Sequence, residues 1–126
     1  MVDRKEGARV RREVLGAEYV DSGLKKAAGD PLAEAFIEFT EEHCWGSVWV
    51  RPGLPRKTRS MLNLAMLTAT GRWHELEVHM RGAIHNGVTK DEVKEILLQV
   101  GVYAGVPSAA EAFRIARAVF AEYERG

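Results

Sequence analysis

Apolar residues recur at helical spacing along this chain, between breaks made by glycine and proline. Recurrence at every third or fourth position is typical of amphipathic helices, and no stretch shows the sustained alternation of a β-strand. The breaks separate about six helical segments, expected over residues 3–16, 30–49, 56–70, 73–86, 89–105 and from 108 onward. The sequence therefore predicts an all-α fold.

Several of these segments carry signals for helix ends. The dipeptide Asp30-Pro31 has the form of an N-cap followed by proline at the first helical position. Asn86-Gly87 is typical of a C-terminal stop. Residues 89–92 (TKDE) and 108–111 (SAAE) both have capping-box spacing, so we expect a helix to start at each.

Residues 56–70 are apolar around most of the expected helix circumference, and Gly71 follows as a stop. Such a pattern is typical of a central helix that is buried on nearly every side. The apolar positions that support this expectation are Met61, Leu62, Leu64, Ala65, Met66 and Leu67.

Size and charge limit the classes of function. A length of 126 residues predicts a single domain over 1–126, and 18 basic residues balance 18 acidic ones. No net field favours nucleic acid or a membrane surface, so neither partner is expected. The single cysteine, Cys44, and a charged N-terminal stretch without an apolar signal core favour a soluble protein of the cytoplasm.

Three stretches then carry a family resemblance: RREVLGAEYVD, CWGSVWVRPGLPRKTRSMLNLAML and ELEVHMRGAIHNGVTKDEVKEILLQVGVYAGVPSAAEAF. Over nearly the whole chain the sequence resembles the carboxymuconolactone decarboxylase family of the alkylhydroperoxidase D-like superfamily. The W-G-x-x-W-x-R-P-G-L element at residues 45–54 is its most specific part. The resemblance implies a helical subunit of about six helices that assembles as a homo-oligomer, a trimer or a hexamer.

The peroxidase branch of the superfamily is an alternative. Its C-x-x-C-x-x-x-H motif aligns here with Arg72, Glu75 and His79, and its upstream glutamate aligns with Ser60. Peroxide reduction needs a reactive thiolate and a resolving cysteine, and only the histidine is retained. A redox function is therefore disfavoured, and a non-catalytic oligomeric binding module is the third alternative.

The resemblance implies a cofactor-independent carboxy-lyase. Its substrate is a small lactone dicarboxylate, 4-carboxymuconolactone or a related lactone, and its product is 3-oxoadipate enol-lactone of the β-ketoadipate pathway in aromatic catabolism. The substrate carries its own electron sink, because the electron pair left by carbon dioxide runs through the ring double bond to the lactone carbonyl. No cofactor and no metal are therefore expected.

Two arginines are the expected substrate clamps, because a planar guanidinium can make paired charge-assisted hydrogen bonds to a carboxylate. Arg51 lies in the W-x-R-P-G element, and Arg59 opens the apolar segment. Trp45 and Trp49, four residues apart, are expected to stack along one helix face, as core or subunit interface or as a wall of the substrate site.

His79 is the expected catalytic residue. It lies four residues after Glu75, so the two side chains share a helix face and the carboxylate can orient the ring. A lone histidine on an apolar helix is otherwise a satisfied core residue. His74 and His85 are expected to be exposed, His43 receives no role, and Cys44 is expected to be a buried bystander.

Overall fold

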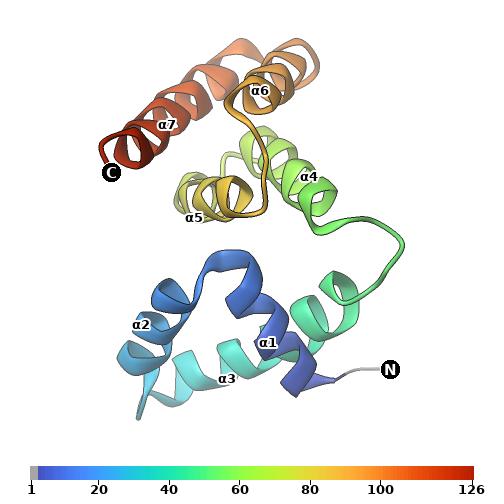
Figure 1. The fold of residues 1–126 in the computed structure, drawn as a ribbon, viewed down its shortest axis with the longest axis vertical. Helices are drawn as coiled ribbons and strands as arrows, with labels where there is room; N and C mark the ends of the chain where they lie inside the picture. Colours follow the sequence, from blue (N-terminus) through green and yellow to red (C-terminus); the bar gives the residue numbers. More distant parts are fainter. Residues whose placement is uncertain (1–2) are drawn as a thin grey trace. The chain divides into compact units, whose positions relative to one another are not determined.

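The structure is a computed structural model that describes residues 3–126. These residues form seven α-helices and one π-helix and contain no β-strand, so the all-α prediction is confirmed (Figure 1). The elements are α1 (Arg4–Leu15), α2 (Ala17–Ala27), α3 (Pro31–Thr40), the π-helix η1 (Glu41–Trp49), α4 (Arg56–Ala69), α5 (Trp73–His85), α6 (Lys90–Ala104) and α7 (Val106–Glu124).

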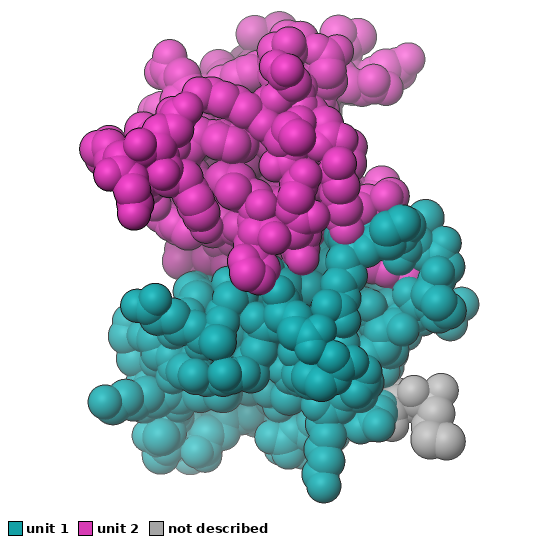
Figure 2. Space-filling view, viewed as in Figure 1, with its two compact units in different colours: residues 1–56 teal, residues 57–126 magenta. Residues whose placement is uncertain are grey.

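The chain divides into two compact units (Figure 2). Residues 1–56 form unit 1, which contains α1, α2, α3 and η1, and residues 57–126 make up unit 2, which holds nearly all of α4 together with α5, α6 and α7. The expectation of one domain over 1–126 stays a prediction. Among the described helices, none is both long and apolar enough to cross a lipid bilayer.

Unit 1 is built around a close crossing of α1 and η1. Gly7 of α1 has no room for a side chain, since a Cβ there would lie 2.0 Å from the carbonyl oxygen of Glu41 and 2.6 Å from the backbone nitrogen of Gly46. The crossing buries a small core of Val10, Val14, Trp45 and Trp49. Glycine at both positions allows the two backbones to touch, which brings the tryptophans against α1.

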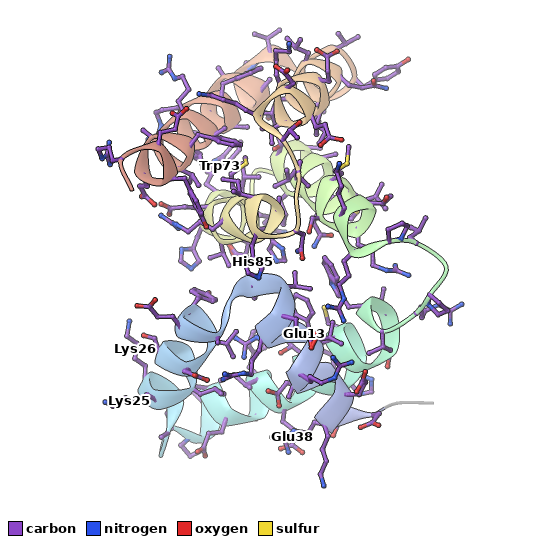
Figure 3. All side chains as sticks on the ribbon, in the orientation of Figure 1. Glu13, Lys25, Lys26, Glu38, Trp73 and His85 are labelled. Carbon is purple, nitrogen blue, oxygen red and sulfur yellow. The ribbon has the colours of Figure 1, made fainter. Side chains whose placement is uncertain are left out.

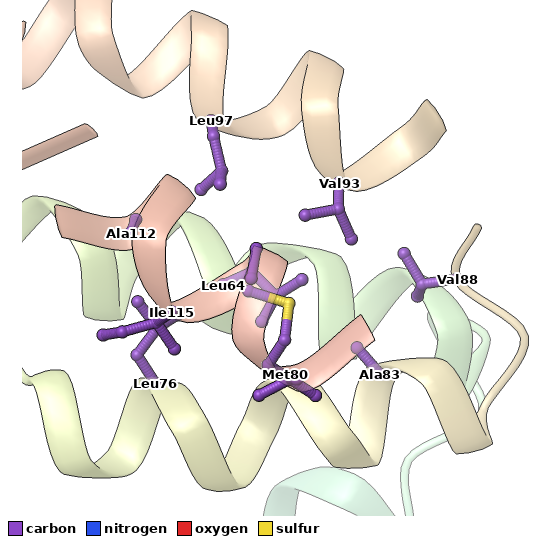
Figure 4. Packing of buried hydrophobic residues seen from close by; sticks show 11 residues of the cluster. Leu64, Leu76, Met80, Ala83, Val88, Val93, Leu97, Ala112 and Ile115 are labelled. Atoms are coloured by element: carbon purple, nitrogen blue, oxygen red, sulfur yellow. The ribbon is translucent and has the colours of Figure 1, made fainter. Parts of the chain in front are cut away.

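Unit 2 has the larger core. Residues of all four of its helices meet in one cluster, much of which is completely buried (Figure 4). Leu64 comes from α4, Leu76 and Met80 from α5, Leu97 from α6 and Val119 from α7. An ion pair of 3.0 Å between Arg81 and Glu122 also joins α5 to α7. The helix α5 is thus held on its buried face by each of its neighbours in the unit.

Most of the expected helix ends are confirmed. The side chain of Asp30 accepts hydrogen bonds from the first turn of α3, and the capping box at Thr89 and Glu92 begins α6. Gly71 and Gly87 adopt positive φ after α4 and α5, as their stop positions require.

The fold adds to or differs from the expected elements in three details. Residues 17–27, which had no assignment, form α2. The capping box expected at Ser108 is absent, because α7 already begins at Val106 and places Pro107 in its first turn, where proline needs no partner for a backbone N–H. The segment expected over 30–49 is helical throughout, but it widens into a π-helix from Glu41.

The helix α4 is also less buried than its composition predicts. Leu64, Ser60 and Thr68 are buried, but Leu62 is 46% exposed and Met66 is 56% exposed. Each of these two side chains lines a surface groove between α4 and α6. Apolar residues around most of α4 therefore did not mean that every side of this helix is buried within the single chain.

Candidate active site

His79 lies at the edge of the buried face of α5. The residue after it, Met80, is completely buried, and Leu76 and Ala83 lie on the same core face. The imidazole itself is half-buried. Because its neighbours on the helix belong to the core of unit 2, the position of the ring is set by packing and does not depend on a loop.

A side chain of α4 reaches the ring of His79. The Nδ2 atom of Asn63 lies 3.4 Å from Nδ1 of His79, a long hydrogen bond between the two helices. Nearby, Nδ2 of Asn86 donates to Oγ of the buried Ser60 at 3.2 Å. These two contacts form a polar connection between α4 and the end of α5. Asn63 stands in an apolar segment and belongs to no motif, so its place in the sequence did not predict this contact.

The electrostatic surroundings keep His79 neutral near neutral pH. Burial disfavours the imidazolium and holds the pKa of His79 below its ordinary value. The carboxylate of Glu75, one turn earlier on α5, acts in the opposite direction with the smaller effect. Glu75 is exposed, so its charge is screened by water. A neutral imidazole can donate one hydrogen bond and accept another.

Arg59 occupies the same face of α4 as Asn63, because the two residues are four positions apart. Its side chain is half-buried. The face of α4 that contacts His79 therefore also carries a guanidinium. In unit 2 the amide of Asn63 contacts the imidazole of His79, and the carboxylate of Glu75 acts on the same ring. Arg59 lies one turn before Asn63 on α4.

The remaining expected residues lie in unit 1. Trp45 and Trp49 are both buried, and their rings stack with centroids 4.9 Å apart and an interplanar angle of 28°. The expected stacking is thus confirmed, and so is their place in a core. Arg51 follows η1 in an exposed loop, where its backbone N–H donates to the carbonyl of Val48 at 3.0 Å. A common site for the residues of the two units stays a prediction.

The other candidate residues of the sequence analysis have plainer surroundings. His74 and His85 are exposed as expected, and His85 is the last residue of α5 (Figure 3). His43 is exposed, with its ring 4.9 Å from that of Phe39. Cys44 is exposed, which corrects the expectation that it is buried, and it is not among the residues of the unit 1 core.

The sequence profile described as the carboxymuconolactone decarboxylase family matches residues 34–118, more than half of the chain. The chain belongs to this family.

Three relatives have sequences similar to this one. A 4-carboxymuconolactone decarboxylase of Acinetobacter baylyi is 45% identical over 116 residues, which cover 92% of this chain and 85% of that protein. A nitrosuccinic acid decarboxylase of Metarhizium robertsii is 48% identical over 107 residues, 85% of this chain and 73% of that protein. An uncharacterized 15.0 kDa protein of Paracoccus denitrificans is 35% identical over 83 residues, 64% of this chain and 62% of that protein.

Proposed function

We propose that this protein is a carboxy-lyase that converts 4-carboxymuconolactone to 3-oxoadipate enol-lactone in the β-ketoadipate pathway of protocatechuate catabolism. The observation that carries the proposal is the 45% identity, over 92% of the chain, to a relative named 4-carboxymuconolactone decarboxylase. The half-buried His79, held between two helices of the unit 2 core, supports it as a centre for the reaction.

The reaction asks three things of the protein. The bond between the ring carbon and its carboxylate breaks, carbon dioxide leaves, and the electron pair moves through the ring double bond to the lactone carbonyl oxygen. A proton then adds to the ring, which gives the enol-lactone. The protein must therefore hold two carboxylates, stabilise the charge on the carbonyl oxygen, and admit a proton.

We assign the charge stabilisation to His79. A neutral imidazole is a weak acid but a good hydrogen-bond donor, so its natural task is to donate to the carbonyl oxygen as that oxygen becomes negative. The same ring can then relay a solvent proton to the carbon. Within unit 2, Arg59 is assigned to a substrate carboxylate and Glu75 to the orientation and basicity of the ring. Arg51, Trp45 and Trp49 of unit 1 stay predicted substrate-binding residues. No cofactor or metal is assigned.

A second candidate substrate is nitrosuccinate, favoured by the 48% identity to a relative named nitrosuccinic acid decarboxylase. The two substrates share their essential chemistry. Each is a dicarboxylate that can delocalise the electron pair left behind by the departing carbon dioxide. In the lactone this pair passes to the conjugated carbonyl, and in nitrosuccinate it passes to the nitro group. Two arginines and one hydrogen-bond donor to an oxyanion suit both.

One experiment tests the proposal and separates the candidates. The purified protein is mixed with freshly prepared lactone or with nitrosuccinate, and carbon dioxide release is measured together with the ultraviolet spectrum. We expect rapid release from the lactone and a kcat/KM for nitrosuccinate that is at least about 10-fold lower. Release from nitrosuccinate alone would assign the second function, and release from neither would contradict both.

We also propose that the chain acts as a homo-oligomer, a trimer or a hexamer, in the cytoplasm. Support comes from a groove of about 630 Å³ between α4 and α6, lined by Met61, Leu62 and Ile96. Its acidic rim of Asp91, Glu92 and Glu95 does not suit a dicarboxylate substrate, whereas its apolar floor suits a second copy of the chain. A stable monomer in sedimentation at micromolar concentration would contradict this proposal.

A further inference from the structure

In the structure the amide nitrogen Nδ2 of Asn63 faces Nδ1 of His79 at 3.4 Å. An amide nitrogen carries two protons and can only donate. A hydrogen bond in this arrangement requires that Nδ1 accept, and therefore favours a ring in which Nδ1 carries no proton. In a neutral imidazole the single proton is then on Nε2, the nitrogen on the other edge of the ring.

We propose that Asn63 is a positioning residue that fixes His79 in the tautomer with its proton on Nε2, so that Nε2–H is the group that faces the reaction. This inference rests on the proposed function, in which His79 donates a hydrogen bond to the developing oxyanion. It adds a residue that neither the family's sequence motif nor the alignment with the peroxidase branch had indicated.

An amide at position 63 has a different effect on the imidazole of His79 than a carboxylate would have. A carboxylate facing Nδ1 would accept a hydrogen bond from that nitrogen, which favours the tautomer with its proton on Nδ1 and also favours the imidazolium. The amide of Asn63 instead favours the tautomer with its proton on Nε2, and it adds no charge beside the ring. The carboxylate on the helix of His79 itself, Glu75, is exposed and one turn away, and the charged group on the facing helix α4, Arg59, is cationic. The exposure of Glu75 and the positive charge of Arg59 are both compatible with a neutral imidazole at His79.

The contact is also well supported by its surroundings. Leu64, the residue after Asn63, is completely buried in the same cluster as Leu76 and Met80 of α5. The spacing between α4 and α5 is therefore fixed by the core on one side. On the polar side, the hydrogen bond from Asn86 to Ser60 joins the same two segments. Asn63 consequently meets the ring from a rigid element, as a positioning role requires.

Nuclear magnetic resonance of the imidazole nitrogens tests the proposal directly. The chain is labelled with ¹⁵N histidine, and the signal of His79 is assigned among the four histidines as the one lost in His79→Gln. In the wild type we expect a protonated Nε2 and an unprotonated Nδ1 at about pH 7.5. A wild-type signal with the proton on Nδ1 would overturn the proposal without any variant.

Two variants complete the test. Asn63→Asp keeps the shape of the side chain but can only accept, so we expect the proton to move to Nδ1 and kcat to fall by about 10²–10³-fold with KM little changed. The matched control is Asn86→Ala, which removes the other hydrogen bond between the two segments. We expect it to lower stability slightly but to leave the tautomer and kcat unchanged.

The outcomes separate this inference from the proposed function. An Asn63→Asp protein with the wild-type tautomer, or with a normal kcat, would overturn the positioning role. Equal losses of kcat in Asn63→Asp and Asn86→Ala would also overturn it, since the effect would then be structural. If the wild type turns over no lactone, the proposed function fails, whereas the tautomer of His79 is still read from the nitrogen spectrum.

Discussion

The close crossing of α1 and η1 provides the sharpest test of the fold, through the substitution Gly7→Ala. A Cβ at Gly7 would lie 2.0 Å from the carbonyl oxygen of Glu41, whereas real Cβ contacts below 3.0 Å are essentially never seen. The obstructing atoms are backbone, including the nitrogen of Gly46 at 2.6 Å, so no side chain can rotate away. The helices must instead separate by about 1 Å, a displacement in the range where overpacking costs about 1–3 kcal/mol.

The matched control is Gly23→Ala in α2. Nothing lies within 4 Å of a Cβ at Gly23, and its φ is not positive. Alanine there gains about 0.5–1 kcal/mol from the lower entropy of the unfolded chain, a gain that Gly7→Ala shares but that does not offset the clash. Urea unfolding should therefore place Gly7→Ala below the wild type, by up to about 2.5 kcal/mol after that gain is subtracted, and Gly23→Ala above it. A Gly7→Ala protein as stable as Gly23→Ala would refute the close crossing.

Three further predictions concern the site. Arg51→Ala and Arg59→Ala should each raise KM for the lactone by about 10–100-fold with a smaller effect on kcat, because each removes a charge-assisted hydrogen bond of about 1.5–3 kcal/mol. Unchanged steady-state kinetics in both variants would mean that other residues bind the carboxylates. Turnover should survive treatment with a chelator and the substitution Cys44→Ser, and a loss restored by added metal would overturn the metal-free mechanism. Burial holds the pKa of His79 below 6.5 in the folded chain, so the unfolded state binds more protons as the pH falls, and native stability decreases from about pH 6.5 downward through the folded pKa. His79→Gln should therefore lose less stability than the wild type between about pH 7.5 and about pH 5.5 in urea unfolding, and equal losses would contradict a buried, neutral ring.

Much of the fold could be predicted from the sequence, because its helix ends are encoded locally. Asp30-Pro31 and the Thr89 capping box act within one turn, so their effect does not depend on the rest of the chain. The helix α2 was missed because its N-cap residue, Gly16, provides no capping side chain to mark where it starts. Only Val20 and Ala27 are buried in it, and a serine and a glycine, both poor helix formers, interrupt the pattern.

The candidate site was predictable only in part. The motif and the helical spacing identified His79, but they could not identify Asn63, whose significance comes from the packing of α4 on α5. Long-range contacts of this kind have no signature in local periodicity. The same limit explains why Leu62 and Met66 were expected to be buried, since hydrophobicity alone cannot say whether an apolar face meets the core of its own chain or another surface.

The kcat of His79→Gln on 4-carboxymuconolactone shows whether His79 is the catalytic centre of a decarboxylase. The control is His85→Gln, an exposed histidine on the same helix. We expect His79→Gln to lower kcat by at least about 10²-fold, with helix content by circular dichroism unchanged, and His85→Gln to match the wild type. A near-native kcat in a folded His79→Gln protein would contradict the account and leave His79 as a core residue.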